Sequence, residues 1–382
     1  MQKALVREIR MIGTTKTNHR DTRTQSFFVS LCLCAWSFWF LLRGEFASRK
    51  FRLILNSSVA LCLLLSFSIS AHPPQDSPKR PVRPGVKTPG VQRQITAVTP
   101  AAVFPVEGTP DWQVVTPDAV WVTNAAKNTV HRLDAKTNTV AATIEVGKKP
   151  CSGLAAGFGS IWVPNCGDKT MSRIDVKTNE IVATVLAGPA NSEGGIAASA
   201  DSVWMLSDAK GIISRIDPDT NTVVAEIQVP AGSFACVVGE DGAVWVSSTD
   251  NSLLARVDPK TNLVTDKIEV GPRPRFLTAG GGSIWTLNQG DGTVSRVDVK
   301  TKKLVQHIEV GVPGNGGEIA YGEGFVWVTV FDIPLSQIDP ATNKVVKQWL
   351  GPGGDSVRAG LGSVWISNLR QGNVWRIDSK MK

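Results

Sequence analysis

Histidine is scarce in this chain of 382 residues: there are four, His19, His72, His131 and His307. No Cys-x-x-Cys-His motif is present, which argues against a haem-attached redox enzyme. An apolar run long enough to span a membrane comfortably is also missing. The stretch 27–42 is rich in Phe, Trp and Cys but short for a comfortable membrane span.

An excess of positive charge is absent from most of the chain, although the total is +8. Residues 1–93 hold 15 Lys and Arg against 4 Asp and Glu, and the remaining 26 Lys and Arg face 29 Asp and Glu. The basic excess therefore belongs to the N-terminal extension. A mildly acidic remainder lacks the electrostatic footprint of a nucleic-acid-binding protein, so we expect no nucleic-acid partner.

The N-terminal extension has the pattern of an export signal. Arg49, Lys50 and Arg52 precede the apolar run 59–69, and small residues around Ser70 and Ala71 provide a cleavage site. We predict an export region over residues 1–71, with a translation start downstream of 27–42, and a Pro-rich linker over 72–93. The location is then periplasmic or secreted; the alternative is a membrane anchor through the N-terminal apolar segments. After signal removal we expect no stable membrane span and a monomer.

The rest of the chain is a repeat. Val or Ile precedes a tryptophan seven times, at gaps of 41, 42, 41, 40, 42 and 38 residues. Ten or eleven residues later comes Arg (Gln in one unit), followed by an aliphatic residue and Asp. The tryptophans are Trp121, Trp162, Trp204, Trp245, Trp285, Trp327 and Trp365.

A period of about 40 residues holding four short strands is typical of a propeller blade. In residues 271–311 we predict strands at 276–279, 283–287, 293–297 and 304–310. We therefore predict an all-β domain over 94–382, a seven-bladed β-propeller of four-stranded antiparallel blades. The last unit ends at Asp378 without its fourth strand, and residues 94–106 are predicted to complete that blade and close the ring.

Two repeated residue types have plain structural explanations. The Asp of each Asp-x-x-Thr-Asn segment is expected to cap a turn between the third and fourth strands rather than to bind metal. The repeated Trp is expected to fill space between blades rather than to stack on a ligand.

With its G-x-G-S-V-W-V and R-I-D-P-x-T-N segments, the chain resembles the YVTN-type bacterial β-propellers and the streptogramin lyase (virginiamycin B lyase) group. The resemblance covers about residues 94–382. For the lyases it implies a His general base, with His and Glu holding magnesium near the central channel. This chain departs from that pattern, because His131 and His307 are predicted on outer strands and cannot reach the channel.

Ligand sites in propellers form where the inner strands meet at the channel mouth. Positions nine to eleven before each Trp supply candidates for that mouth, together with neighbours just beyond them. The predicted site residues are Asp111, Trp112, Asn191, Glu193, Arg273, Arg275, Asn315, Glu318 and Asp355.

Two interpretations of these residues stay open. Glu193, Glu318 and Asp355 would suit Ca²⁺ or Mg²⁺, or they form ion pairs in a solvated rim, which is the commoner outcome. The amide-rich loops after the second strands suit either ligand binding or turn capping. They contain Asn124, Asn165, Asp208, Ser248, Asn288, Gln289 and Asn368.

We therefore predict a non-catalytic exported propeller that binds a ligand or protein partner at its channel face. The alternative is a metal-dependent lyase or a lactonase-type hydrolase. The cofactor in that case would be Ca²⁺ or Mg²⁺, and the residues do not identify a substrate.

Cys151 and Cys166 are a candidate disulfide. If Phe158-Gly159 forms a two-residue hairpin turn, the two cysteines lie opposite each other on antiparallel strands, within disulfide reach. The alternative is two free thiols. Cys236 is predicted to be buried and unpaired.

Overall fold

The computed structural model describes residues 85–190, 193, 195–314 and 316–381. The predicted export region and most of the predicted linker lie outside these residues, and so do Asn191 and Asn315. In the described part, no helix has the length and apolarity to cross a bilayer.

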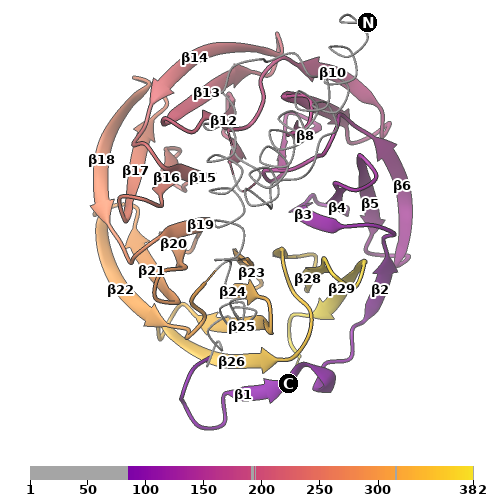
Figure 1. The fold of residues 1–382 in the computed structure, drawn as a ribbon, viewed down its shortest axis with the longest axis vertical. Helices are drawn as coiled ribbons and strands as arrows, with labels where there is room; N and C mark the ends of the chain where they lie inside the picture. The colour runs from indigo at the N-terminus through magenta and orange to yellow at the C-terminus, as the bar shows by residue number, and fades with distance from the viewer. Residues whose placement is uncertain (1–84, 191–192, 194, 315, 382) are drawn as a thin grey trace, which may run out of the picture. The chain divides into compact units, whose positions relative to one another are not determined.

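Seven sheets form a ring around a central channel, and each sheet contains a four-stranded antiparallel blade (Figure 1). The seven-bladed all-β fold predicted from the repeat is confirmed. Blade 1 contains β3 (Pro110–Val115), β4 (Ala119–Asn124), β5 (Thr129–Asp134) and β6 (Thr139–Glu145). Blade 2 contains β7 (Ala155–Gly157), β8 (Ser160–Asn165), β9 (Thr170–Asp175) and β10 (Ile181–Val185). Blade 3 contains β11 (Ile196–Ala198), β12 (Val203–Asp208), β13 (Ile212–Asp217) and β14 (Thr222–Gln228).

The remaining blades repeat this order from the channel outwards. Blade 4 contains β15 (Ser233–Val238), β16 (Val244–Ser248), β17 (Leu253–Asp258) and β18 (Leu263–Glu269). Blade 5 contains β19 (Pro274–Gly280), β20 (Ser283–Asn288), β21 (Thr293–Asp298) and β22 (Lys303–Glu309). Blade 6 contains β23 (Glu318–Gly322), β24 (Phe325–Val330), β25 (Ile333–Asp339) and β26 (Lys344–Leu350). Blade 7 contains β27 (Val357–Gly360), β28 (Ser363–Asn368), β29 (Asn373–Asp378) and one strand from the N-terminal side.

That last strand is β2 (Ala102–Pro105), which pairs antiparallel with β29 and closes the ring, as predicted. Only this part of the segment 94–106 enters blade 7. The chain before it forms β1 (Gln92–Gln94), which adds a parallel fifth strand to β26 of blade 6, and then the 3₁₀ turn η1 (Ile95–Ala97). The N-terminal segment therefore covers the outer edge of one blade before it completes the next.

The repeated tryptophans lie on the second strand of each blade and are completely buried. In four blades the indole Nε1 donates to the carbonyl of a glycine five residues earlier, at the end of the first strand. The rings therefore join the first two strands of a blade and fill the space toward the next one, as expected.

Five of the six repeated arginines connect neighbouring blades, a role that was not predicted; the exception, Arg256, pairs with Asp241 and Asp266 of its own blade. Arg296 packs its guanidinium on Trp285, 4.7 Å from the ring centroid, and its Nη1 donates to Asn343 Oδ1 of the next blade at 2.8 Å. Equivalent bonds run from Arg132 to Asn179, Arg173 to Asn221, Arg215 to Asn262 and Arg376 to Asn138. The last of these joins blade 7 to blade 1.

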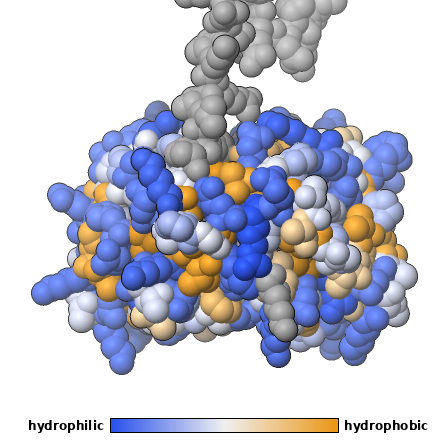
Figure 2. Space-filling model, turned by 90° about the horizontal axis from the view of Figure 1, so that it is seen from below, coloured by the Kyte–Doolittle hydropathy of each residue, from blue (hydrophilic) through white to orange (hydrophobic). Residues whose placement is uncertain are grey.

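The Asp-x-x-Thr-Asn segments are capped turns, as predicted. Asp134 Oδ1 accepts hydrogen bonds from the amides of Lys136 and Thr137. The Asn of the segment adopts the left-handed conformation, with φ of 56° at Asn138, which asparagine tolerates better than most residues. Aliphatic side chains at the start of the fourth strands, such as Val182 and Val224, are exposed. Figure 2 shows that apolar residues are dispersed among hydrophilic ones on the side of the propeller seen there.

Candidate functional site

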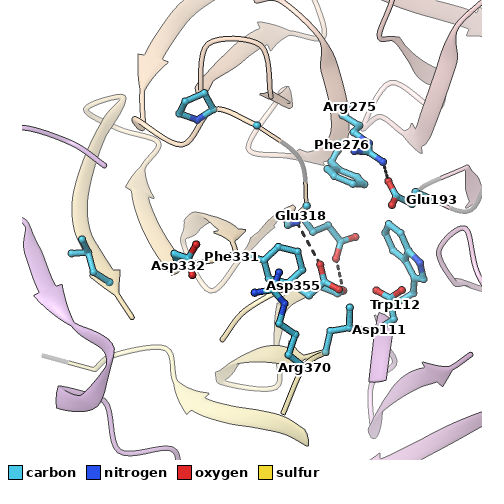
Figure 3. A pocket seen from close by; sticks show the side chains of 17 residues that line it. Asp111, Trp112, Glu193, Arg275, Phe276, Glu318, Phe331, Asp332, Asp355 and Arg370 are labelled. Carbon is cyan, nitrogen blue, oxygen red and sulfur yellow. Dashed lines mark hydrogen bonds and ion pairs between the residues drawn. The ribbon is translucent and has the colours of Figure 1, made fainter. Parts of the chain in front are cut away.

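The inner strands all enter the ring at the same end, so residues near their starts converge on one channel mouth. A cavity of about 890 Å³ lies there (Figure 3). Six predicted residues line it: Asp111, Trp112, Glu193, Arg275, Glu318 and Asp355. Of the described candidates, Arg273 is not among the lining residues; its carbonyl accepts the amide of Gln289.

One wall of the cavity is aromatic. The ring centroids of Trp112 and Phe276 lie 5.9 Å apart, and Phe276 meets Phe234 edge-on at the same distance. Trp112 and Phe276 also line a second space of about 360 Å³ further along the channel, whose walls are mostly small and aliphatic residues. These two rings, together with Glu318, therefore line both spaces.

Arg275 connects this wall to the opposite side of the mouth. Its guanidinium lies 4.4 Å from the Phe234 centroid and 5.4 Å from that of Phe276. It forms an ion pair with Glu193 and donates to Gln289 Oε1 at 3.2 Å. Glu193 thus forms an ion pair with an arginine, which agrees with the interpretation that this carboxylate belongs to an ion-paired, solvated rim.

Glu318 is buried and fully engaged. One carboxylate oxygen accepts from the Ser356 hydroxyl and from the Val357 amide at 3.1 Å, and the other pairs with Arg358 at 2.5 Å. This carboxylate holds blades 6 and 7 together at the mouth.

Asp111 and Asp355 form a pair of carboxyl groups that have fewer hydrogen-bond and ion-pair partners than Glu318. Their side chains are hydrogen-bonded to each other, and Asp355 also accepts from the Gly317 amide at 3.5 Å. Burial, the charges of Asp355 and Glu318, and this hydrogen bond raise the pKa of Asp111 well above its usual value. Burial and the charge of Glu318 raise the pKa of Asp355 to about 6, although Gly317, Asp111 and Arg370 act in the opposite direction. The pair therefore shares a proton over much of the acidic range.

The sequence interpretation missed Phe331, Asp332 and Arg370, which also line the cavity. The guanidinium of Arg370 lies 4.2 Å from the Phe331 centroid. All three lie in loops after second strands, as the amide-rich residues do. Their position in these loops could have indicated that they line the cavity, whereas their residue types could not.

Four of the amide-rich loop residues have partners inside the protein. Asn124, Asn165, Asn288 and Asn368 are buried and bond to nearby backbone or side chains. Gln289 differs, because it bonds both Arg275 and the Gly316 carbonyl at the cavity. Asn124 and Asn368 thus bond the backbone of a loop, whereas Asn165 and Asn288 bond serine hydroxyls on the adjacent strand.

The histidines lie away from the mouth. His131 is on β5, within hydrogen-bonding distance of Thr129 and Thr143, and burial lowers its pKa. His307 is on the outer strand β22, beside Ser295. Neither is among the residues that line the cavity.

A metal ion would need several free donors. In the described ranges, no group of three or more His, Cys, Asp or Glu side chains is arranged to hold one. Glu193 pairs with Arg275, and both oxygens of Glu318 have partners. Ca²⁺ or Mg²⁺ at Glu193, Glu318 and Asp355 stays a prediction.

The two predicted cysteines are bonded in the structure. Cys151 and Cys166 form a disulfide with a Cα–Cα distance of 5.9 Å. Phe158 and Gly159 both have positive φ, and Gly157 pairs with Ser160, so the assumed hairpin register is present. Cys236 is buried and not disulfide-bonded.

Comparison with known proteins supports the fold. Residues 166–284 match a family model described as a domain of unknown function (DUF5074). No curated protein sequence matches the chain.

Several solved structures share the architecture. A streptogramin B lyase has a TM-score of 0.62 at 18% identity and covers 72% of this chain and 94% of its own. A catalytically inactive virginiamycin B lyase from Staphylococcus aureus, solved with quinupristin, has a TM-score of 0.61 at 16% identity, covering 71% and 94%. Kuenenia stuttgartiensis hydrazine synthase has a TM-score of 0.59 at 14% identity, covering 78% and 100%. At these identities the likeness establishes a shared propeller fold and nothing about activity.

Proposed function

We propose that this protein is an exported, non-catalytic β-propeller that binds a small ligand, or an exposed segment of a protein partner, in the cavity at its channel mouth. The observation that carries the proposal is the cavity itself. It has about 890 Å³, with aromatic rings on one side and a hydrogen-bonded carboxyl pair on another. Apolar walls with a few convergent polar groups are typical of ligand sites.

The lining indicates the chemistry of the ligand. Trp112, Phe276 and Phe331 offer ring faces or edges to a flat or apolar surface. Glu318 has an ion pair with Arg358, whereas in the described part of the chain neither Asp111 nor Asp355 forms an ion pair, although the charge of Arg370 acts on Asp355. A ligand with an apolar body and an amine or another hydrogen-bond donor would match both features, since an amine replaces the shared proton.

The disulfide supports the location. Such bonds persist in oxidising compartments, as expected for a periplasmic or secreted protein. A signal over residues 1–71, a linker over 72–93, a monomeric state and the absence of a nucleic-acid partner are part of the same proposal.

Binding is tested with a panel of aromatic primary amines, quaternary ammonium compounds and neutral isosteres, using thermal shift and then calorimetry on the full chain. We expect the amines to raise the melting temperature and to lose at least tenfold in affinity in the D355N variant. The matched control is D250N, at an exposed aspartate. Equal affinity of charged and neutral compounds, or no loss in D355N, contradicts the proposed ligand chemistry.

The second candidate is a metal-dependent lyase or lactonase-type hydrolase. The observation in its favour is that three adjacent blades each supply a carboxyl group to the mouth: Glu318, Asp355 and Asp111. Elemental analysis, together with thermal shifts in Ca²⁺, Mg²⁺ and EDTA, separates the candidates. A stoichiometric ion with turnover of a lactone substrate favours the enzyme, and indifference to all three additions favours the binding protein.

A further inference from the structure

The loop next to the disulfide has an unusual backbone conformation. Lys149 and Ser152 have φ of 55° and 67°, and Gly153 has φ of 88°. Ser152 is 1% exposed. For a residue other than glycine, this left-handed region is strained and persists only where the surroundings hold it.

The disulfide and two flanking hydrogen bonds hold the loop. The Cys151 amide donates to the Pro164 carbonyl, and the Cys166 amide donates to the Lys149 carbonyl, both at 2.9 Å. The bond between Cys151 and Cys166 ties the same two segments covalently. The loop of residues 149–153 is therefore fastened to the end of β8.

The loop in turn anchors the start of blade 3. The Gly195 amide donates to the Ser152 carbonyl at 3.0 Å and lies 3.3 Å from the Ser152 hydroxyl oxygen. The Gly195 carbonyl accepts the Leu206 amide at 2.8 Å. Ser152 and Leu206 therefore both hold the chain just before β11.

Glu193 stands two residues before this anchor and forms the ion pair with Arg275 at the cavity wall (Figure 3). The pair joins blade 3 to blade 5, and Phe234 of blade 4 lies against the guanidinium. Contacts therefore connect the disulfide through Ser152 to Gly195, which lies two residues along the chain from Glu193 in the lining of the cavity.

We propose that the Cys151–Cys166 disulfide is a redox-sensitive latch on the cavity wall, a property separate from the ligand class proposed above. A dithiol reductant supplies two electrons and two protons, becomes a disulfide itself, and leaves thiols at Cys151 and Cys166. The loop of residues 149–153 then relaxes, and the Gly195 amide loses its acceptor. Glu193 leaves Arg275, whose guanidinium becomes available to an anion.

Hydrogen–deuterium exchange of the full chain tests the first half of the latch. In dithiothreitol, and in the C151S/C166S variant without reductant, the amide of Gly195 is expected to exchange at least tenfold faster, while amides of β20 are unchanged. Dithiothreitol should have no effect on C151S/C166S, and C236S should behave as the wild type. Unchanged exchange at Gly195, or an equal increase throughout the propeller, overturns the proposal.

Two experiments test the rest. Adding S152G to C151S/C166S relieves the cost of the positive φ, so protection at Gly195 is expected to recover in part; no recovery overturns the role of the loop. Inorganic phosphate is the probe for Arg275: it should raise the melting temperature of reduced protein and of oxidised E193Q, but not of oxidised wild type or reduced R275Q. An equal response of the oxidised and reduced wild type contradicts the release of Arg275.

Discussion

Replacing Asp355 by asparagine should stabilise the protein at neutral and alkaline pH. Asp355 accepts one hydrogen bond from the Gly317 amide and shares a proton with Asp111. The amide oxygen of asparagine still accepts from Gly317, and its NH₂ group donates to Asp111 without any titration. The D355N variant therefore keeps the shape and the hydrogen bonds of the site and removes one buried charge.

The magnitude follows from the pKa of Asp355, which burial and Glu318 raise from 3.8 to about 6. Between these values the folded protein holds more protons than the unfolded chain, so stability falls as the pH rises from about 4 to about 6 and stays at the lower level above. A tenfold change in proton affinity corresponds to about 1.4 kcal/mol, which gives about 3 kcal/mol. Because solvent still reaches part of the side chain and Asp111 shares the effect, we expect about 2 kcal/mol.

Urea unfolding followed by tryptophan fluorescence, at pH values from 4.5 to 8, measures the effect. The wild type should lose about 2 kcal/mol over this range, D355N should lose clearly less, and the exposed control D250N should follow the wild type. The range stops at pH 4.5 because a second effect begins at lower pH. Hydrogen bonds from their turns lower the pKa values of Asp134, Asp175 and Asp217, so protonation of these carboxylates destabilises the fold. Wild-type stability that rises from pH 5 to 8, together with D355N less stable at pH 8, would refute the reasoning.

Three further changes test the fold, each by urea unfolding. F104A should lower the free energy of unfolding by about 3 kcal/mol, because Phe104, on the strand that closes the ring, is buried against Trp365. V103A, at an exposed neighbouring residue, should lower it by less than about 1 kcal/mol. Similar losses in the two variants would show that packing of the closing strand does not stabilise the ring. R296K should lower the free energy of unfolding by about 2 kcal/mol, because the bonds to blade 6 and the packing of the guanidinium on Trp285 are lost. R256K should lower it less, because Arg256 pairs with Asp241 in its own blade. Equal losses of stability would argue against the connection between blades. K302N should raise the free energy of unfolding by about 0.5 to 1 kcal/mol, because Lys302 has φ of 56° at the position that asparagine occupies in other blades. The ion pair of Lys302 with Asp266, which the substitution removes, is partly exposed and contributes little. A loss of stability would show that the ion pair contributes more than the relief of backbone strain.

Much of the fold could be predicted because each repeat carries its own local instructions. Glycine and asparagine at positive φ mark the turns, and the Val-Trp or Ile-Trp pair marks a buried strand. The hairpin register at Phe158-Gly159 brought the two cysteines together by counting alone. The parallel strand β1 had no such signal, since pairing with β26 depends on an edge far away in the sequence.

The candidate site could be predicted only as a set of positions. A fixed offset from each Trp places Asp111, Glu193, Glu318 and Asp355 at one mouth, because the blades repeat the same geometry. The pairing partners could not be read in the same way. Asp111 joins Asp355 rather than Glu193, and Glu193 reaches across blade 4 to Arg275.

The sequence by itself determined the number of blades, the closing strand and the end of the channel where the candidate residues gather, since these depend on local periodicity and on turn chemistry. The tertiary structure decided which carboxyl group has a counter-charge, which pair shares a proton, and which arginines join one blade to the next. Those properties depend on distances between residues of different blades, and the curvature of the closed ring determines these distances. No spacing along a single repeat contains them.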